Sequence, residues 1–313
     1  MELTRTPFTA QAPRTIAIPD EVMEVAAQSL GAFFEPICKV DRYRNAKDFL
    51  DYTKSFKRAE ILERYTPMQS RKLLEIGSGF GTNLAVWLKY YGVEGWGVEP
   101  GGEGFNQGYI ASRKLLAANG LDPDRVLNTE GENLPFPDES FDIVYSANVL
   151  EHTARPGKVV AEALRVLRPG GLFHMEMPNH LSYFEGHYMV VMPPLIWKAI
   201  LPWWIKWVIR RDPAFTHTVR TEINPIWCRR TVRELAGVYP LELISLGEEL
   251  FLERLSQPFV FETQMVEGHL QRMIGWIKTL NAGNWLGRLI VGLQGHYPIY
   301  MTVRKGPAKS LAQ

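Results

Sequence analysis

A run of alternating glycines is the first feature of the sequence that could do chemistry. The stretch EIGSGFG spans residues 75–81 and follows the apolar run RKLL. Glycine has no Cβ, so the backbone can adopt positive φ and approach a ligand closely. A dinucleotide loop has the spacing G-x-G-x-x-G, but Thr82 stands where its third glycine would be, and a phosphate loop needs a lysine that FGTN lacks. The loop therefore favours a nucleoside ligand without a phosphate.

An acidic residue stands where it could hold the ribose of such a ligand. Glu99 in WGVEP lies 20 residues beyond Gly79, at the end of a predicted strand. For S-adenosylmethionine, a sulfonium nucleoside, an acid at this place is expected to bond both ribose hydroxyls. A solvated loop acid is the alternative for Glu99, and a nicotinamide enzyme is a weaker alternative for the loop.

Alternating strands and helices position these residues. Apolar runs predict strands at 72–77, 94–100, 124–131, 140–149, 172–178, 241–248 and 297–305. Helical patterns stand between them at 82–92, 106–120, 156–168 and 229–238, with mainly helical segments at 20–65 and 250–292. Repeated βα units of this length predict an α/β fold in which helices cover both faces of a mostly parallel sheet.

The same patterns divide the chain into five segments. We expect an N-terminal helical lid at 1–65, a ligand-binding Rossmann-like core at 66–178 and a tryptophan-rich helical insertion at 179–228. Residues 229–305 complete the core with the last two strands, and 306–313 form a disordered tail.

Several quoted motifs together resemble one known family. LLEIGSGFG, VEP, TEGENLPFPDESFDIVYSANVLEH and ALRVLRPGGLF, in this order within residues 71–178, are similar to class I S-adenosylmethionine-dependent methyltransferases. Within that class the chain most resembles the methyltransferase type 11 group, which includes ubiquinone and menaquinone ring methyltransferases. The resemblance implies S-adenosyl-L-methionine as cofactor and a seven-stranded sheet whose last strand is antiparallel.

The resemblance also assigns cofactor-binding positions. The family often has an Asp-Ala pair that contacts the adenine. This chain has Glu130-Gly131, followed by Glu132, at that place, so a longer glutamate replaces the aspartate of the family pattern. At Asn148 the family uses a backbone carbonyl to hold the amino group of the ligand. The full set of expected cofactor residues is Glu75, Gly77, Ser78, Gly79, Gly81, Glu99, Glu130, Gly131, Glu132 and Asn148.

Candidate acceptor-side residues follow the fourth and fifth predicted strands. The carboxyl ends of strands in an open α/β sheet face the ligand crevice. The segment NHLSYFEGHY, 179–188, leaves the fifth strand and offers His180, Glu185 and His187, while His152 in LEH follows the fourth. We expect His187, oriented by Glu185, to deprotonate an acceptor hydroxyl, with His152 and His180 as alternatives. Strand residue His174 alternates with apolar neighbours and is expected to pack.

These residues lead to a functional prediction with alternatives. The main hypothesis is O-methylation of a hydrophobic, lipid-linked, glycan or natural-product acceptor. Methylation of carbon or nitrogen in a quinone-like or other small molecule is the first alternative. A non-catalytic protein that binds a partner through the insertion is the second.

Composition narrows the partners and the compartment. Among 313 residues, 35 Lys plus Arg balance 34 Asp plus Glu, so no strong field attracts nucleic acid. Cys and His do not cluster at metal-ligand spacing, so no metal is expected. Without a signal-like N-terminus we expect a cytoplasmic protein. Segment 190–209 is apolar and rich in tryptophan, but prolines and lysines interrupt it, so no spanning helix is expected. The insertion is interpreted either as a helical lid whose aromatic residues form a core, as an element that contacts a membrane surface from one side, or as an aromatic pocket for a soluble apolar substrate.

Overall fold

A seven-stranded sheet forms the centre of the computed structural model. The model describes residues 13–38, 40–101, 107–188, 190–191, 200–217, 220, 222–256 and 283–307. The strands of this sheet are β1 (Lys72–Ile76), β2 (Glu94–Val98), β3 (Val126–Leu127), β4 (Phe141–Ala147), β5 (Leu167–Met177), β8 (Leu241–Ser245) and β9 (Ile299–Lys305). Their order is β3-β2-β1-β4-β5-β9-β8. Strands β1 to β5 pair in parallel, whereas β9 runs antiparallel to both of its neighbours. The predicted fold class is confirmed.

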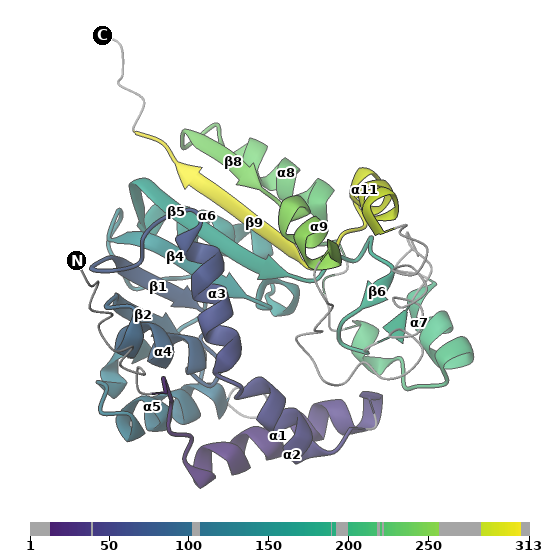
Figure 1. Cartoon of the computed structure of the whole chain (residues 1–313), viewed down its shortest axis with the longest axis horizontal. Coiled ribbons are helices and arrows are strands. Elements are labelled where there is room, and N and C mark those ends of the chain that lie inside the picture. The colour runs from purple at the N-terminus through teal and green to yellow at the C-terminus, as the bar shows by residue number, and fades with distance from the viewer. Residues whose placement is uncertain are drawn as a thin grey trace, which may run out of the picture.

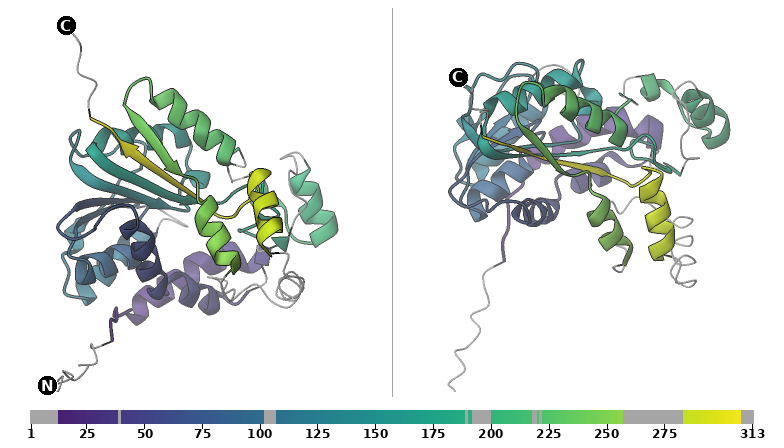
Figure 2. Two further views of the ribbon diagram at one scale, coloured as in Figure 1. Left: turned by 45° about the horizontal axis from the view of Figure 1, so that its top comes forward. Right: turned by 90° about the horizontal axis from the view of Figure 1, so that it is seen from above.

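Helices cover both faces of this sheet (Figures 1 and 2). The longer ones are α1 (Asp20–Cys38), α2 (Arg42–Phe49), α3 (Thr53–Glu63), α4 (Thr82–Tyr90), α5 (Gly108–Ala118), α6 (Pro156–Val166), α8 (Pro225–Leu235), α9 (Glu248–Ser256) and α11 (Gly283–Gly292). Alternate residues of a strand face opposite sides, so Leu73 packs in the core under α3, α4 and α5, and Leu74 packs in the core under α6 and α8. Both side chains are fully buried.

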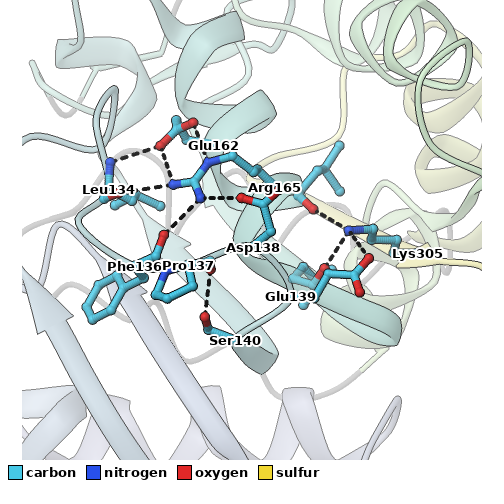
Figure 3. A network of polar contacts seen from close by, with 11 residues as sticks. Leu134, Phe136, Pro137, Asp138, Glu139, Ser140, Glu162, Arg165 and Lys305 are labelled. Atoms are coloured by element: carbon cyan, nitrogen blue, oxygen red, sulfur yellow. Dashed lines mark hydrogen bonds and ion pairs between the residues drawn. The ribbon is translucent and has the colours of Figure 1, made fainter. Parts of the chain in front are cut away.

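Two side chains of α6, Arg165 and Glu162, bind the loop between β3 and β4 (Figure 3). Arg165 donates hydrogen bonds to the backbone carbonyls of Leu134 and Phe136 and forms ion pairs with Glu162 and Asp138, at 2.7–3.0 Å. Glu162 in turn accepts from the Leu134 N–H at 3.0 Å. The segment that follows the glutamate pair of the motif TEGENLPF is therefore held to the helix that packs beneath it.

The insertion after β5 combines a small hairpin with short helical turns. Strands β6 (Phe184–Glu185) and β7 (Val190–Val191) pair antiparallel, and α7 (Leu201–Trp204) continues as a π-helix over 205–209. Ile37 of α1 packs against Tyr188, Leu201 and Phe215 of the insertion. The first helix and the insertion therefore share one apolar cluster at the end of the sheet where β5 stops (Figure 1).

Two expectations differ from the structure. The segment RPGG was expected to end a helix before a strand beginning at 172, but β5 already begins at Leu167, which pairs with Phe141. Gly170 accommodates the irregular pairing there with a φ of 80°. The hairpin β6–β7 was also not expected in a helical insertion. The expected helical stretch within 257–282 and the tail 308–313 lie outside the described residues.

Candidate active site

The glycine loop turns at the carboxyl end of β1, next to the loop that follows β4. Gly77, Gly79 and Gly81 have φ values of 72°, 53° and 81°, which favour glycine. A Cβ on Gly77 would lie 2.2 Å from Cγ2 of Val149, so the two loops touch there. Among the described residues, nothing lies within 4 Å of a Cβ placed on Gly79. The loop therefore needs its glycines and leaves an open cradle over its middle.

Glu99 reaches this cradle from the end of β2. The N–H of Gly79 donates to Oε2 of Glu99 at 2.9 Å, although the two residues belong to different βα units. Burial raises the pKa of Glu99 to about 7. Glu99 therefore lies at the end of β2 beside the glycine loop, as expected, and its contact with a ribose stays a prediction.

Glu75, the last acid of β1, is buried beneath the same loop. Asn83 donates to its Oε1 at 2.7 Å, and among the described residues its Oε2 has no hydrogen-bond partner. Burial raises the pKa of Glu75 to about 8, against the lowering effects of Asn83 and of Arg58. A buried carboxylate oxygen with unused acceptor capacity suits the positively charged amino group of a methionine moiety.

Arg58 of α3 connects the N-terminal helices to Asn83, the residue that donates to Glu75. Arg58 of α3 donates to Glu176 of β5 at 3.2 Å and to Asn83 at 3.5 Å. The sequence analysis did not single out these three residues, because the network forms only when α3 packs on the sheet. It fixes the side chain that holds Glu75.

The other expected cofactor residues differ in their surroundings. The side chain of Ser78 is buried against Gly97, where an added Cβ would meet its Oγ at 2.9 Å. Glu132 is buried and accepts from the N–H of Arg155 at 3.3 Å, at the start of α6. Glu130 is exposed. Contacts of Ser78, Glu130 and Glu132 with a ligand stay predictions.

Gly131 and Asn148 have clear backbone reasons for their residue types. A Cβ on Gly131 would lie 2.8 Å from Cγ2 of Ile76 on β1, so glycine allows this close packing. Asn148 is exposed and has a φ of 53°, a left-handed conformation that asparagine tolerates well. Its N–H donates to the carbonyl of Glu176 at 2.9 Å, which fixes the turn after β4.

The acceptor-side candidates meet at the ends of β4 and β5. Nδ1 of His187 lies 2.8 Å from Oε1 of Glu185, and Oε2 of the same carboxylate accepts from the N–H of Tyr188 at 2.7 Å. The centroid of the His187 ring lies 5.4 Å from that of His152 and 6.5 Å from that of His180. The His180 and His187 rings are nearly parallel. The structure therefore brings together all four residues expected on the acceptor side.

Aromatic side chains enclose this group. Phe215 lies 4.9 Å from the His187 ring and 6.2 Å from the His152 ring, measured between centroids. A Cβ on Gly186 would lie 2.1 Å from the hydroxyl of Tyr297, so glycine is needed between Glu185 and His187 to admit this tyrosine. Phe184 packs on Tyr297 at 5.2 Å. An acceptor at this place meets rings as well as charges.

Glu185 makes the His187 ring more basic than a free imidazole. Burial acts to lower the pKa of His187, but the charge of Glu185 and their hydrogen bond outweigh it and raise the pKa above its usual value. Burial acts to raise the pKa of Glu185, and His187 lowers it. Burial also raises the pKa of a third acid in this region, Glu151, to about 7. The sequence analysis missed Glu151, although it stands beside His152 in the quoted motif LEH.

His174 lies away from this group. Its ring is buried between Tyr145 and Tyr300 and its Nδ1 lies 2.9 Å from Oγ1 of Thr302 on β9. The expectation that this histidine packs inside the sheet is confirmed.

Comparison with known sequences finds similarity over the central part of the chain. The family model for a methyltransferase domain matches residues 74–175. An uncharacterized methyltransferase of Mycobacterium avium (strain 104) is 40% identical over 120 residues, which are 38% of this chain and 44% of that protein. The chain thus matches less than half the length of this curated relative.

Solved structures agree on the fold. A candidate sarcosine dimethylglycine methyltransferase from Galdieria sulphuraria has a TM-score of 0.50 and 17% identity, over 92% of this chain and 99% of that one. Phosphoethanolamine N-methyltransferase 2 of Haemonchus contortus, in complex with phosphomonomethylethanolamine and S-adenosylhomocysteine, has a TM-score of 0.51 and 16% identity, over 88% and 60%. The likeness to both is one of fold.

Proposed function

We propose, from the premise that residues 74–175 form a methyltransferase domain of the class I fold, that the protein is an S-adenosylmethionine-dependent methyltransferase. The observation that carries the proposal is the carboxylate of Glu99 over the open glycine loop, 2.9 Å from the N–H of Gly79. A non-catalytic partner-binding protein would have no use for this arrangement.

The residues at the loop divide the work of binding. Glu99 would accept hydrogen bonds from the ribose hydroxyls, and Glu75, with its unpartnered Oε2 among the described residues, would accept from the amino group. S-adenosylmethionine supplies an electrophilic methyl group on a sulfonium. The protein holds the acceptor in line with it, and such positioning accounts for much of the rate of a displacement reaction.

We further propose that the acceptor atom is the oxygen of a hydroxyl group. The dyad of His187 and Glu185 supports this assignment, because an oxygen nucleophile needs a proton acceptor and a carboxylate on Nδ1 fixes the tautomer of the ring. As the methyl group passes from the sulfonium to the oxygen, leaving a neutral thioether, His187 would take the hydroxyl proton at Nε2 and Glu185 would stabilise the resulting charge. Carbon or nitrogen methylation is the alternative that needs no such base.

The surroundings favour a hydrophobic acceptor, including one linked to a lipid or carrying a glycan. Phe215 lines the histidines, and the nearby insertion exposes Trp203 and Trp207, which are 56% and 61% exposed. Lys206 lies over the Trp207 ring at 5.3 Å. Among the described residues, no helix has the length and hydropathy to span a bilayer. We propose that this aromatic face contacts a membrane surface from one side.

A turnover experiment tests the acceptor assignment. Labelled S-adenosylmethionine and a native extract would first identify the methylated product. With that acceptor, His187→Ala should lower kcat by about 10²–10⁴ while the affinity for S-adenosylmethionine is nearly unchanged. His217→Ala, an exposed histidine of the same insertion, is the matched control. Normal turnover of the His187 variant would move the base elsewhere, with His152 and His180 next.

A further inference from the structure

Three side chains of metal-ligand type meet at the acceptor end of the sheet. Glu151 and His152 lie in the 3-10 turn after β4, and His187 lies in the loop after β6. One ligand atom from each lies within 4.8 Å of the other two. Because β4 and β5 are paired neighbours, segments far apart in the sequence reach the same point. Two imidazoles and one carboxylate form the ligand set of many catalytic zinc sites.

The burial of the Glu151 side chain is the second observation at this point of the fold. Its side chain is 1% exposed, and among the described residues neither carboxylate oxygen has a hydrogen-bond partner. A buried carboxylate without partners is costly, so such a group is retained where something charged or polar completes it. A cation bound by Glu151, His152 and His187 together is the simplest partner for this carboxylate.

The hydrogen bond of His187 also has the form found around metals. A metal-binding histidine usually donates its other ring N–H to a carboxylate, which fixes the tautomer and makes the ligand nitrogen more basic. Glu185 is in that position at Nδ1, at 2.8 Å, and is itself held by the N–H of Tyr188. Nε2 is then the nitrogen of His187 that coordinates.

We propose that Glu151, His152 and His187 bind one divalent transition-metal ion, with Zn²⁺ as its type. Ligand atoms bound at about 2.0–2.1 Å to one tetrahedral ion lie about 3.3 Å apart. The three ligand atoms now lie within 4.8 Å of one another, so side-chain rotations that move each by about an ångström would bring them to this spacing. Three protein ligands leave one position of a tetrahedral ion open, and His152, an exposed residue, puts the site within reach of solvent.

The chemical role of the ion rests on the proposed methyl transfer, whereas its binding does not. A hydroxyl oxygen at the open position would bind the ion and release its proton to water at neutral pH, as metal-bound water does. His187 would then act as a ligand instead of a base. This reading revises the expectation that no metal is used, which came from spacing along the sequence alone.

Metal binding to the whole protein tests the proposal without any acceptor. After chelation and buffer exchange, Zn²⁺ affinity is measured by competition with a chromophoric chelator, and Co²⁺ is used to record the absorption of a tetrahedral site. We expect one ion per chain. Glu151→Gln and His152→Ala should each weaken Zn²⁺ by at least about 100-fold, and Glu185→Gln by about 10–100-fold. His217→Ala should bind like the wild type.

Two outcomes would overturn the site. One is a wild-type affinity no tighter than that of Glu151→Gln, and the other is an equal loss in the His217 control. Since the His152 ring is exposed, His152→Ala keeps the test valid if the Glu151 variant fails to fold. Calorimetry with S-adenosylmethionine on the metal-free protein runs in parallel. A protein that takes Zn²⁺ but not the nucleoside contradicts the proposed function and leaves the metal site standing.

Discussion

At the scale of single residues, Glu99 is the position on which cofactor binding depends most. Hydrogen bonds from neutral donors to a charged acceptor contribute about 1.5–3 kcal/mol each. Glu99→Ala should therefore weaken S-adenosylmethionine by at least about tenfold in calorimetry. Glu94→Ala removes an exposed acid from the same strand and should leave the affinity unchanged. Equal affinities of wild type and Glu99→Ala would remove Glu99 as the ribose ligand.

The raised pKa of Glu99 makes cofactor binding dependent on pH. The ionised carboxylate is the form that accepts two ribose hydroxyls, and in the free protein it loses its proton only near pH 7. Binding must displace that proton at lower pH, so the contribution of Glu99 to the affinity should be nearly constant well above pH 7 and fall by about tenfold from pH 8 to pH 6. Glu75 titrates in the same direction. We expect the affinity of Glu99→Gln for S-adenosylmethionine to depend less steeply on pH than that of the wild type. The same pH dependence in both proteins would refute the contribution of Glu99.

At the scale of elements, the contacts of Arg165 should stabilise the packing of α6 against the loop before β4. Its guanidinium serves two carbonyls and two carboxylates and is mostly buried. Arg165→Ala would leave these carbonyls and carboxylates without their donor. We expect it to lower the free energy of unfolding by about 2–4 kcal/mol. Urea denaturation measures this as a lower midpoint. The exposed Arg233 of α8 is the control, with an expected change below about 0.5 kcal/mol.

The sequence predicts those elements whose signals are local. Strands β1 and β2, the glycine loop and the place of Glu99 follow from apolar runs and glycine spacing in two consecutive βα units. The hairpin β6–β7 could not be predicted, because two-residue strands carry no periodic pattern. The meeting of Glu151 with His187 depends on the pairing of β4 with β5 and on two loop conformations. The Arg58–Glu176 pair likewise depends on how α3 packs.

At the scale of the whole molecule, the insertion presents the surface that would meet a lipid bilayer. Trp203 and Trp207 are exposed on α7 and the π-helix, with Lys206 and Arg210 nearby. We expect the protein to co-sediment with anionic liposomes and its tryptophan emission to shift to the blue, because interfacial aromatic and basic groups bind such surfaces. The double variant Trp203→Ala/Trp207→Ala should stay in the supernatant.

The matched control for this surface lies across the molecule. Ile110 is 55% exposed on α5, at the opposite end of the view in Figure 1. Ile110→Ala should sediment like the wild type. Wild-type protein that remains entirely in solution, with unchanged emission, would restrict the insertion to covering the acceptor.

The position of β9 has a consequence for how the protein is made. Strand β9 lies between β5 and β8, yet the ribosome synthesises it after the other six strands of this sheet. Until residues 299–305 emerge, the longest strand, β5, has one bare edge, and bare edges of apolar strands pair with other chains. The nascent chain is therefore most prone to aggregate before these last residues emerge. A premature stop codon just upstream of Ile299 would release a chain with this edge bare, even though residues 74–175 had been translated.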